Sequence, residues 1–249
     1  MIDKSVLKKI IEAADLTRED IVLEIGPGLG ILTLELTKKV KKVIAIEKDR
    51  ILCQVLRDIL RAEKINNVEV INNDVLKMTN DQFPMTNQIP NTNYKIVANL
   101  PYYITSPVIR KFLEIENPPK EMILMVQKEV AQRICAAPPR MNLLAVAVQF
   151  YSDSQIISYV SKKSFYPQPR VDSAIIKIIP RKSALLSALF CDKFFELVKM
   201  GFSSKRKMLK NNLPEIDFEK LGLNSKIRAE NLSISEWLKV FHSVDFLDF

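Results

Sequence analysis

Short apolar runs alternate with helix-like segments between residues 21 and 126, and this alternation constrains the fold more than any other feature of the chain. Each run is short enough to be a buried strand, and segments such as LTLELTKKV and RILCQVLRDILRAE between them have helical periodicity. The expected strands are Ile21–Leu23, Val43–Ile46, Val68–Ile71, Lys95–Ala98 and Met122–Val126. Strands that alternate with helices predict an α/β fold, a mostly parallel sheet with helices on both faces.

The pattern changes in the second half of the chain. Two more β-like runs, Gln155–Val160 and Ala174–Ile179, are separated by a proline-rich loop and predict an antiparallel pair at the sheet edge. After Pro180 the segments SALLSALFCDKFFELVKMGF, FEKLGL and ISEWLKVF have helical periodicity. We therefore expect an α/β domain over residues 1–180 and a small helical domain over residues 181–249.

Composition excludes several classes of protein. The chain has 249 residues, 27% of them charged, and no apolar run near the ~18 residues of a membrane-spanning helix, so we expect a cytoplasmic protein without membrane contact. Cys53, Cys135 and Cys191 form no C-x-x-C pair, and His242 is the single histidine. We expect reduced cysteines that serve packing, and neither a metal site nor a histidine-based triad.

The positive charge is concentrated toward the C-terminus. Residues 154–249 carry 16 basic and 10 acidic groups, whereas residues 1–153 carry 21 and 19. Such an excess favours a polyanionic partner, because each neutralised phosphate releases counterions. A solvated basic face explains the charge equally well, so charge alone leaves both interpretations open.

A glycine-rich stretch follows the first expected strand. Three of the five glycines, Gly26, Gly28 and Gly30, lie in EIGPGLG, where they allow the backbone to approach a ligand closely. Glu47 ends the next strand, where a carboxylate can hold ribose hydroxyls. A dinucleotide motif would need glycine or alanine three residues after Gly28, but Ile31 is there. The spacing E-x-G-x-G-x-G instead suits S-adenosylmethionine, which has no pyrophosphate.

Two further carboxylates fit the same donor. Asp74 ends VINND after the third strand and is placed to reach the adenine amine, and Glu24 can face the charged amino-acid part. An ordinary tight turn would explain the glycines alone. It does not explain glycines, Glu47 and Asp74 together at successive strand ends.

The stretch NLPY follows the fourth expected strand, near the edge where open α/β sheets bind ligands. Pro101 makes Leu100 extended and removes a backbone donor, which leaves the Asn99 side-chain oxygen and nearby carbonyls as acceptors. Two acceptors suit an exocyclic amine, because they orient its lone pair toward the donor methyl. Tyr102 can stack on a flipped base. NLPY therefore predicts catalysis of amino methylation by Asn99, Leu100, Pro101 and Tyr102.

The chain resembles the small-subunit ribosomal RNA adenine N6,N6-dimethyltransferases, the KsgA family. The shared motifs occur in the family's order and span most of the chain: EIGPGLG, VIAIE, NND, NLPYYITSP, QKEVAQRI, FYPQPRVDSA, FSSKRKMLKNNL and RAENLS. NLPY alone fits several amino methyltransferases. FYPQPRVDSA and RAENLS are the motifs that point to ribosomal RNA.

The resemblance implies a function and a set of site residues. Residues 1–180 would form a Rossmann-like class I methyltransferase domain, and residues 181–249 an RNA-binding domain. Its substrate would be two adjacent adenosines in the 3′-terminal helix loop of small-subunit rRNA, dimethylated on an immature small subunit by a monomer. Donor contacts would come from Gly26, Gly28, Glu47, Asp74 and Asn99, and substrate contacts from Tyr102, Phe165, Lys205, Arg206, Lys207 and Lys210.

Two departures and two alternatives accompany the resemblance. Family members carry a Q-N-F-L motif before the segment IDKSVLKKI, so we expect a native start upstream of Met1. The family's glycine-containing loop is replaced by the glycine-free CAAPPRMNLLAV. The first alternative is an Erm-type large-subunit rRNA methyltransferase, which has the same fold and the same chemistry. A non-catalytic RNA-binding assembly or transcription factor is the alternative from another class.

Overall fold

The computed structural model describes residues 3–79, 94–181 and 188–244. The chain divides into two compact units. The first comprises Met1–Ala131 and Ser152–Pro180, and the second comprises Gln132–Tyr151 and Arg181–Phe249. The predicted division at residue 180 differs from these units in one segment, residues 132–151, which groups with the C-terminal helices.

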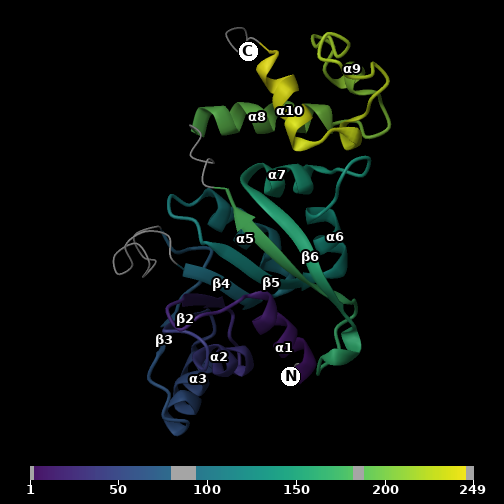
Figure 1. The fold of residues 1–249 in the computed structure, drawn as a ribbon. Coiled ribbons are helices and arrows are strands. Elements are labelled where there is room, and N and C mark those ends of the chain that lie inside the picture. Colours follow the sequence, from purple (N-terminus) through teal and green to yellow (C-terminus); the bar gives the residue numbers. More distant parts are fainter. Residues whose placement is uncertain (1–2, 80–93, 182–187, 245–249) are drawn as a thin grey trace. The chain divides into compact units, whose positions relative to one another are not determined.

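A mixed sheet of seven strands, in the order β3-β2-β1-β4-β5-β7-β6, forms the centre of the first unit (Figure 1). Strands β1 to β5 are parallel, and β7 is antiparallel to both β5 and β6. The strands are β1 (Ile21–Ile25), β2 (Lys42–Glu47), β3 (Val68–Asn72), β4 (Tyr94–Asn99), β5 (Glu121–Gln127), β6 (Ser152–Val160) and β7 (Ser173–Pro180). All seven predicted strands and the antiparallel edge pair are confirmed.

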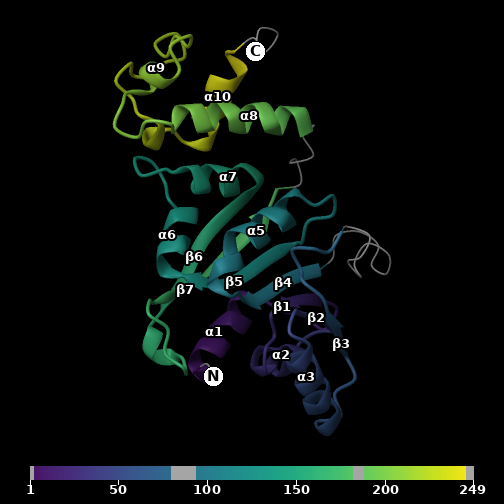
Figure 2. The same ribbon diagram turned by 180° about the vertical axis from the view of Figure 1, so that it is seen from behind.

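Helices cover both faces of this sheet. Alternate strand residues such as Val22, Val43 and Ala45 pack against α1 (Lys4–Ala13), α2 (Ile31–Thr37) and α3 (Arg50–Ala62). The intervening residues, such as Leu23 and Ile44, are buried on the opposite face, where Figure 2 shows α5 (Thr105–Glu114). The parallel strands therefore read as continuous apolar runs because both of their faces are covered.

A buried charge cluster closes the edge of the sheet where the parallel strands begin. Lys95 Nζ lies 2.9 Å from Glu121 Oε1 and 3.3 Å from Asp20 Oδ2, and it donates to the carbonyl oxygens of Ala14 and Asp15 at 2.9 and 2.7 Å. These carbonyls follow α1, so the cluster attaches the end of that helix to the sheet.

The second unit is helical. Its helices are α7 (Leu143–Tyr151), α8 (Ala188–Gly201), α9 (Leu209–Asn212) and α10 (Ile234–His242), and α6 (Lys128–Ile134) crosses the boundary between the units. Phe150 of α7 stacks on Phe194 of α8 with ring centroids 4.5 Å apart. Trp237 is fully buried, and a Cβ atom on Gly201 would lie 2.4 Å from its ring. Packed aromatic rings thus hold α7 to the C-terminal helices.

The helical interpretation of FEKLGL, Phe218–Leu223, is wrong. The segment makes a single turn closed by a hydrogen bond from Leu223 N to Phe218 O at 2.9 Å. Gly222 has a φ of +72°, the left-handed conformation that ends a helix in this way. The described residues also include the short 3₁₀ turns η2 (Tyr102–Ile104), η3 (Lys162–Ser164) and η4 (Ala229–Asn231). Met1, at the predicted truncation, lies outside the described residues.

Candidate functional site

The glycine loop turns sharply between β1 and α2. Gly26, Gly28 and Gly30 have φ angles of +68°, +56° and +78°. A Cβ atom on Gly30 would lie 2.4 Å from Leu56 Cδ1, and one on Gly26 would lie 3.5 Å from Pro101 Cδ. Glycine is therefore required for backbone conformation at all three positions and for space at Gly30. Gly26 therefore lies beside Pro101 of NLPY.

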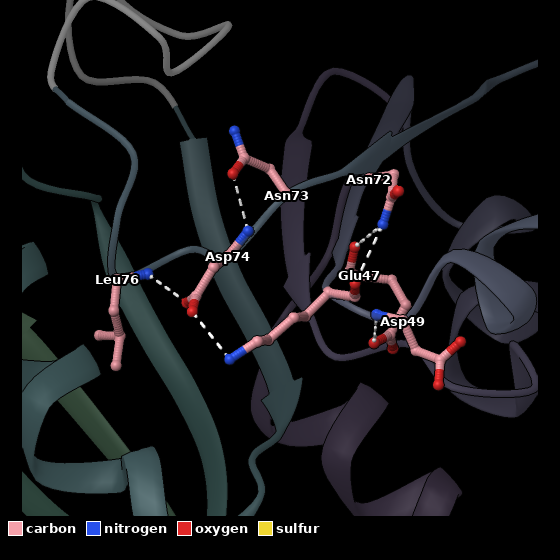
Figure 3. Close-up of polar contacts among 7 residues, drawn as sticks. Glu47, Asp49, Asn72, Asn73, Asp74 and Leu76 are labelled. Atoms are coloured by element: carbon pink, nitrogen blue, oxygen red, sulfur yellow. Dashed lines mark hydrogen bonds and ion pairs between the residues drawn. The ribbon is translucent and has the colours of Figure 1, made fainter.

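Glu47, at the end of β2, connects the glycine loop to the next turn. Its Oε2 accepts a hydrogen bond from Gly28 N at 3.2 Å, and its Oε1 accepts one from Asp49 N at 2.9 Å. Its carbonyl oxygen accepts from Asn72 Nδ2 at 3.0 Å (Figure 3). Glu47 as a whole residue is 9% exposed. Its carboxylate is held beside the glycine loop, where a ribose could reach it.

Asp74 follows β3 and lies beside the same turn (Figure 3). Its Oδ1 accepts from Leu76 N at 3.1 Å, and its Oδ2 lies 3.0 Å from Lys48 Nζ. The pKa of Asp74 is lowered below its usual value. The bond with the Lys48 ammonium is the larger cause, and the hydrogen bond from Leu76 N is the next. Asp74 is therefore a carboxylate that accepts hydrogen bonds, as a contact with an adenine amine requires.

Glu24, on β1, is the least satisfied charged group of this region. It is 2% exposed, and its Oε2 finds no hydrogen-bond partner among the described residues. Burial raises the pKa of Glu24 to about 8, the nearby Thr33 hydroxyl opposes this rise, and the Glu47 carboxylate adds to it. A buried carboxyl whose oxygen has no partner among the described residues suits a ligand that brings a cationic group.

Asn99 to Tyr102 lead from the end of β4 into a 3₁₀ turn. Leu100 is buried and donates its N–H to Met125 O at 3.3 Å, whereas Asn99 and Pro101 are exposed. Tyr102 begins η2, and its hydroxyl lies 2.9 Å from Ser173 Oγ. Thus Leu100 fixes the strand end while Asn99 remains accessible.

These elements enclose a pocket of about 240 Å³. The predicted site residues that line it are Gly26, Gly28, Asn99 and Phe165. Glu24 lines it too. Glu47 accepts a hydrogen bond from Gly28, and Pro101 lies beside Gly26. Asp74 and Tyr102 are outside the lining.

Sequence reasoning missed part of the pocket wall. Leu7 and Ile10 of α1 line it, as do Tyr166 and Pro167. The amphipathic pattern of α1 predicts a buried face, but it does not distinguish core packing from a ligand wall.

The predicted phosphate-binding residues lie in the second unit. Lys205, Arg206 and Lys207 follow α8, and all three are exposed, as is Lys210 at the start of α9. Their role as RNA contacts stays a prediction.

The described part of the chain contains neither a metal-ligand cluster nor a membrane-spanning helix. Within residues 3–79, 94–181 and 188–244, no group of histidine, cysteine, aspartate and glutamate side chains could hold a metal ion. No helix in those ranges is long and apolar enough to cross a membrane.

Comparison with known proteins decides the family. The family described as ribosomal RNA adenine dimethylase matches residues 1–245. The chain belongs to the ribosomal RNA adenine dimethylase family. This match, which spans both compact units, confirms the predicted resemblance and enzyme class, and the sheet topology confirms the fold class.

Relatives within the family have similar lengths. The ribosomal RNA small subunit methyltransferase A of Dehalococcoides mccartyi is 40% identical over 250 residues, which cover 96% of this chain and 84% of the relative. The protein of the same name from Clostridioides difficile is 39% identical over 249 residues, with 95% and 85% covered.

Two solved structures share the complete fold of this dimethylase family member. A dimethyladenosine transferase from Plasmodium falciparum superposes with a TM-score of 0.81 at 30% identity, covering 96% of this chain and 95% of the other. The 23S rRNA methyltransferase ErmE superposes with a TM-score of 0.78 at 26% identity, with 98% of each chain covered. Fold alone therefore does not separate small-subunit from large-subunit substrates.

Proposed function

We propose that this dimethylase family member transfers methyl groups from S-adenosylmethionine to N6 of two adjacent adenosines in the 3′-terminal helix loop of small-subunit rRNA during ribosome maturation. The observation that carries the proposal is the pocket in which the glycine loop, Glu24 and Asn99 meet. It joins a place for a methyl donor to a place for an amine. The small-subunit relatives, about 40% identical, support the choice of RNA.

The residues present fit the donor. Gly26 and Gly28 present backbone at the pocket, and Glu47 beside Gly28 suits ribose hydroxyls. Asp74 suits the adenine amine, and the free oxygen of Glu24 suits the ammonium of the amino-acid part. When bound, the donor supplies an electrophilic methyl group on a sulfonium.

The target amine would be held by acceptors at the strand end. The Asn99 side-chain oxygen and the Leu100 carbonyl accept its two hydrogens, which directs the nitrogen lone pair toward the methyl group. Tyr102 and Phe165 stack on the flipped base. The protein supplies orientation, and no strong general base is needed at the pocket.

The RNA would be held partly by charge. Lys205, Arg206 and Lys207 are exposed on one short turn and suit phosphate groups. We propose a cytoplasmic monomer that acts on the immature small subunit without membrane contact.

Methyl transfer from labelled S-adenosylmethionine to unmethylated small ribosomal subunits tests the proposal, with mapping of the labelled nucleotides. We expect label on two adjacent adenosines of the 3′-terminal loop. Label on cytosine, on protein or only on large-subunit RNA would contradict it. Exclusive methylation of naked large-subunit RNA would establish the Erm-type alternative. The structural similarity to ErmE is the reason to include this RNA in the test.

Asn99→Ala tests the chemistry separately from the fold. We expect transfer to fall by about three orders of magnitude with an unchanged thermal transition, because Asn99 is exposed and supports no packing. Arg110→Ala, on the exposed side of α5, is the matched surface control. Retained activity in Asn99→Ala would contradict the proposed role of Asn99. Absence of donor binding by calorimetry in the unmodified chain would favour the non-catalytic assembly factor.

A further inference from the structure

The first residue of β7 is bonded to the proposed base-stacking tyrosine. Ser173 is fully buried, and its Oγ lies 2.9 Å from the hydroxyl of the half-exposed Tyr102. Ser173 is held in turn by ladders to β5 and β6, where it is opposite Gln127 and Val160. The far end of the Tyr102 ring is therefore attached to the inside of the sheet.

The preceding residue supports the turn that leads to Phe165, the other aromatic proposed to stack on the base. Asp172 Oδ1 accepts a hydrogen bond from Lys162 N at 3.0 Å, and Lys162 begins η3. That turn ends at Phe165, which lines the pocket. The carbonyl oxygen of Asp172 accepts from Lys128 N at 3.0 Å, which attaches it to the end of β5. One strand start thus contacts the supports of both aromatic rings.

We propose that Asp172 and Ser173 are positioning residues that hold the two aromatic walls of the target-base pocket, Ser173 through the Tyr102 hydroxyl and Asp172 through the turn before Phe165. The inference rests on the proposed function, because the rings must stack on a base for their planes to matter.

The physical reason is the freedom of each ring without its support. Tyr102 lies on a three-residue turn with no side-chain cap, so its backbone alone does not fix the ring. Phe165 follows another three-residue turn. Stacking depends on ring plane, and misplacement of a reacting group by about 1 Å lowers rates by up to about a hundredfold. The Ser173 bond holds the far end of the Tyr102 ring, and the Asp172 bond holds the turn that leads to Phe165, before the base arrives.

A double-mutant cycle tests the Ser173 bond. Ser173→Ala and Tyr102→Phe each remove one hydroxyl of the same pair and leave the ring in place. We expect each to lower kcat on unmethylated small subunits by about tenfold, with the double variant no lower than either single one. Donor affinity by calorimetry should stay unchanged, because neither side chain lines the donor pocket. Ser173→Thr, which keeps a hydroxyl, should restore part of the rate.

A matched control separates positioning from general loss of a buried hydroxyl. Ser154 Oγ, on β6 of the same sheet, is also buried and has no hydrogen-bond partner among the described residues. Ser154→Ala should leave kcat unchanged. Wild-type kcat in Ser173→Ala, or a double variant whose loss is the product of the single losses, would overturn the inference. If Ser173→Ala fails to fold, Tyr102→Phe tests the same bond from its exposed side.

Asp172 gives an independent arm. Asp172→Ala removes the acceptor for Lys162 N and should lower kcat by about tenfold, whereas Asp172→Asn keeps an oxygen there and should retain most of the rate. Equal rates in the two variants would overturn this part. Absence of transfer to small subunits by the unmodified chain would instead sink the proposed function, so the two failures are distinguishable.

Discussion

Lys95 and Glu24 are both buried charged residues, and they lie at opposite ends of neighbouring parallel strands. Lys95 has two carboxylates and two carbonyl oxygens within 3.3 Å. Burial lowers the pKa of Lys95, but Glu121 and Asp20 more than offset this and raise it. Glu24 has an oxygen without a partner among the described residues.

The difference separates structure from binding. A buried charge without partners is strongly unfavourable, so it persists only where a ligand or a proton compensates it. Lys95 is compensated by the fold, at the end of the strands opposite the pocket. Glu24 opens into the pocket at the other end, and we infer that its compensation comes from the donor.

The largest expected effect breaks the satisfied side of this comparison. Lys95→Met removes the cation that Asp20 and Glu121 share, although Lys177 still pairs with Glu121. The change should lower the free energy of unfolding by about 3 kcal/mol in urea titrations, because Asp20 loses its buried cation. Lys38→Met is the control, because its pair with Glu35 is exposed and should contribute less than about 1 kcal/mol. A loss as small as that of the control would show that the cluster does not hold the sheet edge.

The next effect concerns pH and Glu24. The pKa of Glu24 is about 8 in the folded chain, above the ordinary value of 4.5, so between these pH values the folded chain keeps a proton that the unfolded chain releases. Stability therefore falls as pH rises through this window. From pH 6 to 7.5 the free energy of unfolding should fall by about 2 kcal/mol relative to Glu24→Gln, at 1.36 kcal/mol per unit. Parallel pH profiles of the two proteins would contradict the burial argument.

The sequence predicted the sheet well because strand runs buried on both faces are distinctive. All five parallel strands and the antiparallel pair were visible as short apolar runs. Helix α7 was missed, because LLAVAVQFY is apolar nearly all round and has no helical stripe. FEKLGL failed for a local reason, the left-handed Gly222.

The site was predictable in its residues and not in its contacts. EIGPGLG and NLPY identify a pocket because glycine allows backbone conformations that other residues avoid, and proline fixes φ and lacks an N–H. The bond between Tyr102 and Ser173 joins residues 71 positions apart, and no periodicity relates them. The free oxygen of Glu24 likewise depends on tertiary packing, so the sequence shows a carboxylate without showing whether it is satisfied.

A third prediction concerns Glu24, the buried carboxyl without a partner for one oxygen among the described residues, and its contribution to donor binding. Glu24→Gln keeps the shape but loses the charge, so donor affinity at pH 8.5 should fall by about tenfold, the scale of one charge-assisted hydrogen bond. At pH 6 the difference should shrink, because the unmodified carboxyl must first release its proton. Calorimetry at the two pH values measures both. Equal affinities at pH 8.5 would show that Glu24 does not face the donor cation.

The smallest effect is expected for an ion pair of nearly the same length as that of Lys95 with Asp20. Lys48 lies 3.0 Å from Asp74, but the Lys48 side chain is 68% exposed, whereas that of Lys95 is 5% exposed. Because water screens an exposed pair, Lys48→Gln should leave the urea midpoint unchanged within error at physiological salt. A loss comparable to that of Lys95→Met would contradict the comparison. It would show that burial does not determine how much an ion pair contributes to stability.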